Sequence, residues 1–347
     1  MSSTLVAFCD VGPTSGVGHL MRCIALSEEY AARGFRVVFA ADAAAVPFAR
    51  DQLAARGFEC VPPPVSTDGY AEVAARLDAK VVLVDSYHLP REVYAALQSA
   101  HPTIALVDGD PHGRVADVLL DQNIGAEDDR WPGAAGRRRL AGLRYALMRD
   151  EILGRRPDRP RTEPDQAAER VPSVLAFFGG TDAGGAAPVL ANALVTTGAP
   201  FALRVVAATP ALRRVLEDIA GRPGQSIEVI DPTQMLAAEV VAADLVVSAA
   251  GTSSWELLCL GAAAGFVAVS GNQRTSYERV VAAGAVAGLG QLAELRDPTG
   301  EAWRTAVPKL HRLLTDPSER SRLRVTGFTL VDGHGRVRVA DALAVEN

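Results

Sequence analysis

Ser15-Gly16-Val17-Gly18-His19-Leu20-Met21-Arg22 follows a short apolar run, Leu5-Val6-Ala7-Phe8-Cys9, and opens a longer amphipathic stretch, Leu20–Tyr30. The apolar run predicts a buried strand, and the amphipathic stretch predicts a helix that ends near Gly34. A helix N-terminus carries free N–H groups and a partial positive charge, which suits a phosphate. A histidine titrates near neutral pH and can take a proton from water or a hydroxyl. The stretch therefore predicts an anion site and a general base within one helical turn, although such a loop can also be a plain tight turn.

Short apolar runs alternate with helical patterns throughout the first half of the chain. This rhythm predicts a parallel, doubly wound sheet. The predicted strands are Leu5–Cys9, Arg36–Ala40, Val81–Val84, Thr103–Val107 and Val118–Leu120, and the predicted helices are Leu20–Arg33, Pro47–Arg56, Tyr70–Leu77 and Arg91–Ala100. Several strands are followed by an acid: Asp10, Asp85, Asp108 and Asp121. Ligands of open α/β sheets bind beyond the carboxyl ends of strands, so these acids border the expected crevice, unless they only cap helices or turns.

The same rhythm returns after a break in the middle of the chain. Residues 154–172 are rich in Arg, Asp, Glu and Pro, which indicates a linker or an exposed loop. Strands are then predicted at Val174–Phe178, Phe201–Val206, Ile227–Ile230, Leu245–Ser248 and Phe266–Val269, with helical patterns between them. We therefore expect an α/β protein with two Rossmann-like domains, 1–153 and 173–347. Two such domains facing each other would form a cleft, a common place for a ligand.

Three loops of the second half carry polar residues at predicted strand exits. Phe178-Gly179-Gly180-Thr181-Asp182 follows the first strand, and its glycines permit close backbone approach. Ala249-Ala250-Gly251-Thr252-Ser253-Ser254-Trp255-Glu256 leads from a strand into a helix, where hydroxyls and free N–H groups could surround one anion and Glu256 could bind a diol such as a ribose. Ser270-Gly271-Asn272-Gln273 offers amides that can read sugar hydroxyls or a base. Each loop could instead be an ordinary turn or a capped helix.

Composition limits the classes of partner. The 347 residues are 48% hydrophobic and carry a net charge of −6, so no overall basic field attracts nucleic acid. No apolar run approaches the ~20 residues that span a bilayer, and the N-terminus has no basic signal-peptide region. The four cysteines, Cys9, Cys23, Cys60 and Cys259, form no Cys-x-x-Cys pair, and we expect them to be reduced and buried. These features predict a cytoplasmic protein without membrane insertion.

Taken together, the motifs resemble nucleotide-sugar enzymes of the GT-B fold. More closely, the chain resembles the UDP-sugar hydrolase of pseudaminic acid biosynthesis and its relatives in spore-coat polysaccharide biosynthesis. The resemblance runs almost end to end and rests on the glycine-loop motif Gly16-x-Gly18-His19-x-x-Arg22-Cys23, on Val84-Asp85-Ser86-Tyr87, Leu119-Leu120-Asp121-Gln122-Asn123 and Arg144-Tyr145-Ala146-Leu147-x-Arg149-x-Glu151, on the three loops of the second half, and on Val331-Asp332-Gly333-x-Gly335-x-x-Arg338-Val339. Two positions depart from the family pattern: Phe8 stands where an arginine is usual, and Gly109 interrupts a frequent Asp-Asp pair.

The resemblance implies roles for particular residues. His19 would orient or deprotonate a water that attacks the anomeric carbon of a UDP-linked amino or deoxy sugar, and UDP would leave without help from a metal ion or cofactor. Asp10 is a further catalytic candidate at the end of the first strand. The sugar side would include Gly16, Gly18, Arg22, Tyr87, Asn123, Gly180, Thr181, Asn272 and Gln273, and the nucleotide would bind to Gly251, Thr252, Ser253, Ser254 and Glu256.

Other functions remain open at this stage. A GT-B glycosyltransferase would use the same base and nucleotide site but pass the sugar to a small-molecule acceptor, and the departures at Phe8 and Gly109 favour this alternative. A nicotinamide-dependent dehydrogenase would fit Gly16-x-Gly18 and Asp42, but Met21 occupies its third glycine position. A sugar sensor without catalysis is the remaining alternative.

Overall fold

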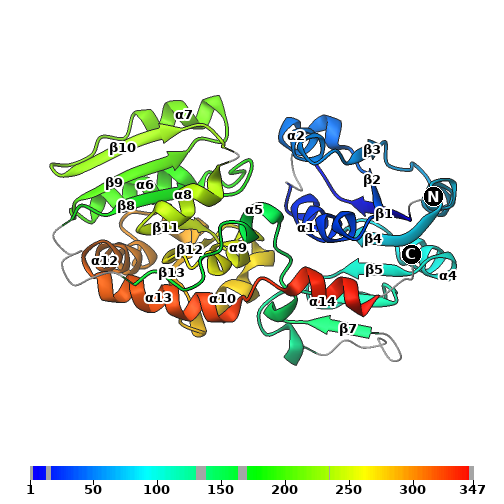
Figure 1. Cartoon of the computed structure of the whole chain (residues 1–347). Coiled ribbons are helices and arrows are strands. Elements are labelled where there is room, and N and C mark those ends of the chain that lie inside the picture. The colour runs from blue at the N-terminus through cyan, green and yellow to red at the C-terminus, as the bar shows by residue number, and fades with distance from the viewer. Residues whose placement is uncertain (1–2, 13–16, 130–137, 163–169, 234, 344–347) are drawn as a thin grey trace. The chain divides into compact units, whose positions relative to one another are not determined.

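The computed structural model describes residues 3–12, 17–129, 138–162, 170–233 and 235–343. The chain forms two compact units: Met1–Asp150 together with Gly333–Asn347, and Glu151–Asp332. Each unit is built on a parallel sheet with helices around it (Figure 1). Among the described residues, no helix combines the length and the hydrophobicity that crossing a bilayer requires.

The N-terminal unit has a seven-stranded sheet in the order β3-β2-β1-β4-β5-β6-β7. Its strands are β1 (Thr4–Cys9), β2 (Arg36–Ala40), β3 (Glu59–Val61), β4 (Ala79–Asp85), β5 (Thr103–Leu106), β6 (Val118–Asp121) and β7 (Arg138–Ala141). All their pairings are parallel. The strand order reverses between β1 and β4, so the carboxyl ends of these two strands border the topological switch point, where α/β sheets commonly bind ligands.

Helices cover both faces of this sheet. The helices are α1 (Gly18–Ala32), α2 (Pro47–Ala55), α3 (Thr67–Arg76), α4 (Arg91–Ala100) and α14 (Gly335–Ala342), with short 3-10 turns η1 (Ala43–Ala45), η2 (Ala126–Asp128) and η3 (Leu143–Tyr145). Leu5 and Ala7 of β1 pack in one core cluster with α1, α2 and α14, whereas Val6 and Phe8 pack in another with α3 and α4. The alternation explains why β1 is apolar from Leu5 to Cys9, because both of its faces are buried.

The C-terminal unit repeats this architecture with six parallel strands in the order β10-β9-β8-β11-β12-β13. The strands are β8 (Ser173–Phe177), β9 (Phe201–Val206), β10 (Gln225–Ile230), β11 (Leu245–Ala249), β12 (Ala264–Ala268) and β13 (Ala287–Gln291). The helices are α5 (Asp150–Leu153, at the boundary), α6 (Ala186–Thr196), α7 (Pro210–Glu217), α8 (Leu236–Ala242), α9 (Ser253–Cys259), α10 (Arg274–Ala282), α11 (Leu292–Leu295), α12 (Glu301–Thr315) and α13 (Pro317–Leu330), with the turn η5 (Gly271–Gln273). Strands β8, β11 and β12 are neighbours in this sheet, so the loops that follow them lie together at the carboxyl ends of the strands.

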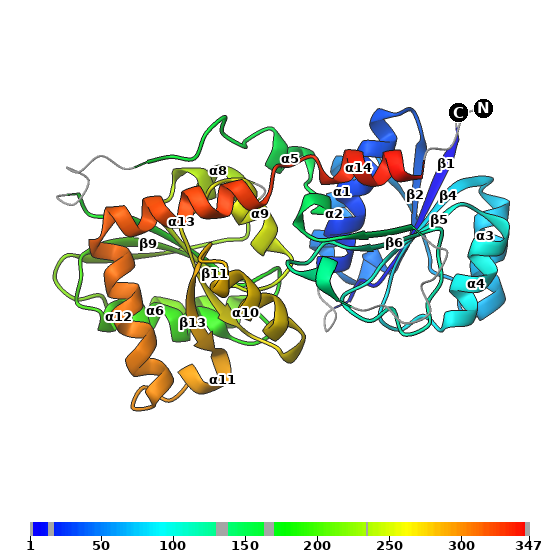
Figure 2. The same cartoon turned by 90° about the horizontal axis from the view of Figure 1, so that it is seen from below.

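The end of the described chain returns to the N-terminal unit. Helix α14 lies beside α1 (Figure 2), where Val339 and Ala340 are buried in the sheet's core cluster. Arg336 forms ion pairs with Glu28 and Asp150. The sequence assigns 173–347 to one C-terminal domain, and the structure instead places 333–347 in the N-terminal unit. The difference arises because apolar spacing predicts a helix but does not say which sheet buries it.

The sheets are wider than the sequence predicts. The additional strands are β3, β7 and β13, and each lies at a sheet edge or carries residues with weak strand preference. Strand β7 begins Arg-Arg and β13 contains two glycines, as is usual where a strand is only partly buried. Cys9, Cys23 and Cys259 are buried free thiols as expected, but Cys60 on edge strand β3 is exposed.

Candidate active site

His19 and Asp85 form a buried dyad at the carboxyl edge of the N-terminal sheet. His19 is the second residue of α1, and Asp85 is the last residue of β4. His19 Nδ1 lies 2.7 Å from Asp85 Oδ1, and the two residues are 7% and 1% exposed. An ionised carboxylate only accepts hydrogen bonds, so Nδ1 carries the proton and Nε2 presents a lone pair. Within the described part of the chain, the polar contacts of His19 with Asp85 and Arg22 are both made by Nδ1, so Nε2 is the nitrogen placed to act as a base.

Arg22 lies one turn after His19 on the same face of α1 and joins two carboxylates. Its Nε and Nη2 donate to Asp85 Oδ2 and Oδ1 at 2.5 and 2.7 Å. Its Nη1 and Nη2 donate to Asp108 Oδ1 and Oδ2 at 2.8 and 2.9 Å. Arg22, predicted on the sugar side, is 5% exposed, and its guanidinium is compensated by two bidentate ion pairs within the site.

Asp108 also organises two residues at the surface of the site. The Tyr87 hydroxyl donates to Asp108 Oδ2 at 2.5 Å, and Asn123 Nδ2 donates to Asp108 Oδ1 at 2.8 Å. Asn123 Nδ2 also donates to Asp121 Oδ1 at 2.8 Å. The Tyr87 ring meets the His19 ring edge-on, with centroids 4.5 Å apart. Because both amide hydrogens of Asn123 are engaged, its Oδ1 is left as an acceptor toward a ligand.

The charges of this cluster set its titration. Burial alone would lower the pKa of His19, but the neighbouring Asp85 carboxylate outweighs burial and the pKa is raised above its ordinary value. Burial opposes ionisation of Asp85 and Asp108 too, yet Arg22 holds the pKa of both carboxyls below their usual range. With His19 neutral, two carboxylates face one guanidinium; a proton on His19 balances that excess charge. This balance is the physical reason for the raised pKa of His19.

The remaining N-terminal candidates lie around this cluster. Asp10 follows β1, and its Oδ2 accepts a hydrogen bond from the Tyr87 backbone N–H at 2.8 Å. Gly18 is the first residue of α1, whose N-cap residue Val17 offers no capping side chain. Gly16 lies outside the described residues. The structure thus brings His19, Arg22, Tyr87 and Asn123 into one network, with Asp10 attached through the backbone of Tyr87.

Asp85 and Asp108 are the functional candidates whose contacts the sequence did not reveal. Both belong to the acids predicted at strand ends, but only the sheet order β1-β4-β5 brings them to α1. Of the two departures from the family pattern, Phe8 is buried in the core and stacks edge-on with Tyr70 at 5.1 Å. Gly109 has φ +80° and donates its N–H to Asp121 Oδ2 at 2.7 Å. Neither departure therefore disturbs the dyad.

The C-terminal candidates lie on the loops after β8, β11 and β12. Gly180 is exposed and Thr181 is half-buried on the first loop. Asp182 closes this loop, because its carboxylate accepts from the backbone N–H groups of Ala186 and Ala187 at 2.8 and 3.0 Å. That carboxylate occupies the start of α6, so this helix end is not available to an anion.

The loops after β11 and β12 touch each other. A Cβ on Gly251 would lie 3.4 Å from Gln273 Nε2, so glycine lets the two loops approach. Gln273 Oε1 accepts from the Val269 N–H at 3.0 Å, which turns Nε2 toward Gly251. The exposed Asn272 accepts a hydrogen bond from Ser270 Oγ at 2.6 Å.

No side chain of the described residues caps the start of helix α9. Thr252 is its N-cap residue, and Ser253 and Glu256 are half-buried. Ser254 is buried, and its Oγ has no hydrogen-bond partner among the described residues. The Ser254 N–H donates to the Gly251 carbonyl oxygen at 2.9 Å, and, unlike the start of α6, this helix end is not capped by a side chain of the described residues.

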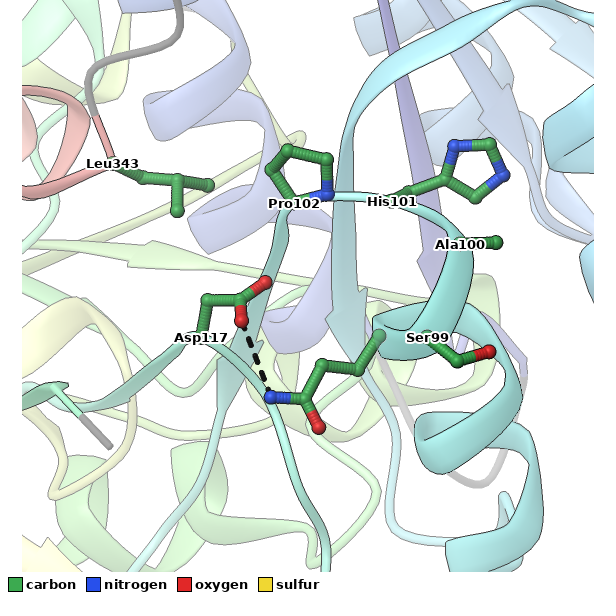
Figure 3. A pocket seen from close by; sticks show the side chains of 7 residues that line it. Ser99, Ala100, His101, Pro102, Asp117 and Leu343 are labelled. Carbon is green, nitrogen blue, oxygen red and sulfur yellow. Dashed lines mark hydrogen bonds between the residues drawn. The ribbon is translucent and has the colours of Figure 1, made fainter. Parts of the chain in front are cut away.

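A surface pocket of about 420 Å³ lies elsewhere in the N-terminal unit (Figure 3). It is lined by residues 98–102, Asp117 and Leu343, and Gln98 donates to Asp117 across it at 3.2 Å. Residues 100–102 precede β5 and Asp117 precedes β6, so the pocket lies at the amino ends of the strands, opposite to the dyad. Within the described ranges, no three His, Cys, Asp or Glu side chains group as metal ligands.

No protein-family model and no curated protein matches this chain. Solved structures do match it over nearly its whole length. MurG of Acinetobacter baumannii has a TM-score of 0.69 and 16% identity over 98% of this chain and 99% of that one. The UDP-GlcNAc 2-epimerase of Neisseria meningitidis bound to UDP-GlcNAc has a TM-score of 0.61 and 11% identity over 98% and 99%. The calicheamicin glycosyltransferase CalG4 has a TM-score of 0.58 and 17% identity over 98% and 97%.

These similarities define the class of fold. Two Rossmann-like units with parallel sheets of seven and six strands, matched along the chain by these enzymes, confirm the predicted GT-B-like fold. At sequence identities of 11–17%, these comparisons establish the fold and no activity. The chemistry has to be argued from the residues of this chain.

Proposed function

We propose that this protein is a nucleotide-sugar enzyme that hydrolyses a UDP-linked amino or deoxy sugar. The observation that carries the proposal is the His19–Asp85 dyad, with Nδ1 held at 2.7 Å from the carboxylate and with no hydrogen bond to Nε2 from the described residues. A histidine oriented in this way is a general base for a hydroxyl nucleophile. The GT-B-like fold supports a nucleotide-linked sugar as the substrate.

In the proposed reaction, His19 Nε2 takes a proton from water as the water oxygen bonds to the anomeric carbon. The bond from that carbon to the β-phosphate oxygen breaks, and its electron pair leaves with UDP. Asp85 stabilises the imidazolium that forms. Tyr87 and Asn123 contact the sugar with oxygen acceptors, and Gly18 lies at the start of α1. Asp10, joined to the backbone of Tyr87, is the second catalytic group.

The C-terminal unit binds the nucleotide in this proposal. The uncapped start of α9, with Gly251, Thr252, Ser253 and Ser254, holds the diphosphate and favours its developing charge. Glu256 binds the ribose hydroxyls. Gly180, Thr181, Asn272 and Gln273 border the same edge of the sheet and contact the remaining polar groups of the substrate.

The experiment is to measure UDP release by ³¹P NMR from a panel of UDP-amino and UDP-deoxy sugars without an acceptor. Wild-type protein and His19→Ala are compared. Release that disappears in the variant supports the hydrolase. A protein that neither binds UDP nor releases it from any sugar overturns the proposal.

A glycosyltransferase is the second candidate, because the dyad could equally deprotonate an acceptor alcohol. Tyr87 is 45% accessible and its ring meets that of the buried His19, so an acceptor bound by Tyr87 would lie next to the base. Turnover that stays slow until an alcohol or amine is added would assign transfer in place of hydrolysis. Fast release in water alone would exclude transfer as the main activity.

A further inference from the structure

Asp108 occupies an unusual position in the active-site network. It does not contact His19, yet it accepts four hydrogen bonds from three other members of the site: two from Arg22, one from Tyr87 and one from Asn123. It lies two residues after the end of β5, and its side chain is 25% exposed. An acid that only capped a turn would accept backbone N–H groups instead, as Asp182 does.

We propose that Asp108 is the positioning residue of this site, which aligns the catalytic dyad through Arg22 and the sugar-contacting side chains through Tyr87 and Asn123. The inference rests on the proposed function for the role of the dyad in turnover, but its structural part does not. One carboxylate then couples two tasks: holding the substrate-facing groups and keeping Asp85 in place against His19.

The geometry explains how Asp108 acts at a distance. Arg22 Nη2 donates to Asp108 Oδ2 at 2.9 Å and to Asp85 Oδ1 at 2.7 Å, and it lies 3.2 Å from His19 Nδ1. Without Asp108, the Arg22 guanidinium keeps only its bidentate ion pair with Asp85 and can rotate about it. Its positive charge is then compensated by Asp85 alone and disfavours the protonated His19 that must form during catalysis.

The charged and titratable groups facing His19 come from every element around it. Among the described residues, Arg22 of α1, Asp85 of β4 and Tyr87 after β4 contact His19, and Asp108 after β5 acts on it through Arg22. Cys23 and Asp10 lie one contact further away, on Asp85 and on the Tyr87 backbone. Arg22 Nη2 contacts both Asp108 Oδ2, at 2.9 Å, and His19 Nδ1, at 3.2 Å, so these two atoms are at most about 6 Å apart. Removing one negative charge at that range lowers the pKa of His19 by about 0.5 to 2 units, depending on the effective dielectric constant.

The test compares Asp108→Asn and Asp108→Glu with the matched control Asp110→Asn. Asp110 is an exposed acid on the same loop, whose carboxylate accepts from the His112 N–H rather than from the site. The pKa of His19 is measured by NMR titration of its ring signals, which needs no substrate, and kcat and KM for UDP release are measured in parallel. Circular dichroism and thermal unfolding show that each variant is folded.

We expect Asp108→Asn to lower the pKa of His19 by 0.5 to 2 units, to reduce kcat by about 10- to 100-fold, and to move the acidic limb of the pH profile with the histidine. Asp108→Glu keeps the charge and should restore the pKa but not the full kcat, because its carboxylate is displaced by one methylene. Asp110→Asn should leave both quantities unchanged.

Three results would overturn the proposal. One is a folded Asp108→Asn protein with the wild-type pKa of His19, and another is an equal shift in Asp110→Asn. The third applies even if Asp108→Asn does not fold: a wild-type kcat in Asp108→Glu would show that the placement of the carboxylate is unimportant. A shifted pKa in a protein that releases no UDP would retain the positioning role and reject the proposed function.

Discussion

Replacing Asp85 with Asn tests the central dyad with almost no change in side-chain shape. In the wild type, Oδ1 receives the His19 Nδ1 proton and one Arg22 N–H, while Oδ2 receives the Arg22 Nε proton at 2.5 Å. An asparagine has one oxygen and one NH₂ group to place at these two positions. Neither orientation satisfies both neighbours.

If the amide oxygen faces His19, the NH₂ group opposes the Arg22 Nε–H, donor against donor. If the NH₂ group faces His19, it donates to Nδ1 and moves the ring proton to Nε2, which removes the base. In both orientations the imidazolium loses its counter-charge, an interaction of about 4 kcal/mol for charges about 4 Å apart at an effective dielectric constant near 20. We therefore expect kcat for UDP release to fall by about 10² to 10⁴.

The assay is UDP release at saturating substrate for wild type, Asp85→Asn, His19→Ala and the double variant, with Asp110→Asn as a charge control. Groups that act as one unit are not additive, so the double variant should be no slower than His19→Ala alone. UDP affinity should be unchanged in all of them, because the proposed nucleotide site is in the other unit. Asp85→Asn activity within fivefold of wild type, beside an inactive His19→Ala, would refute the dyad.

Four further predictions follow from the structure. Turnover should rise with pH through the raised pKa of His19, since only the neutral ring is a base; a flat profile from pH 5 to 8 would contradict this role. The same raised pKa means that ionised His19 stabilises the fold below its ordinary pKa and that this contribution is lost as pH rises through the folded-state value, so His19→Ala should lower the melting temperature more at pH 5.5 than at pH 8.5. Glu256→Gln should weaken UDP binding measured by calorimetry, and a loss of kcat at unchanged affinity would disprove the ribose contact. Gly335→Ala should destabilise the protein by at least 1–3 kcal/mol in urea titrations, because the new Cβ would lie 2.2 Å from the Ala146 carbonyl oxygen, whereas Gly271→Ala, with no atom within 4 Å, should have little effect.

The central strands of both sheets were predictable because their signal is local. β1, β4 and β11 are buried on both faces, and such strands read as continuous apolar runs bounded by polar turns. The start of α1 was predictable for a related reason, since glycines before an amphipathic run mark a strand-to-helix turn. The edge strands β3 and β7 lack this signal, because partial burial demands few apolar residues.

The tail of the chain shows the limit of local patterns. Its helical character is visible in the sequence, but its place against α1 depends on the close approach at Gly335 and on the pairing of Arg336 with Glu28. Arg336 and Glu28 are 308 positions apart along the chain, and Gly335 approaches the backbone of Ala146. No spacing rule connects them.

By itself, the sequence determined the two α/β units, the histidine at the first strand-to-helix turn and the row of acids at strand ends, since each follows from residues close together in the chain. Only the tertiary structure decided which acids serve the histidine. The order β1-β4-β5 brings Asp85 and Asp108, which are 66 and 89 positions after His19, to the same end of α1. Sheet order arises from the burial of whole elements against one another, so the pairing that sets the charge of the site appears only when the sheet is complete.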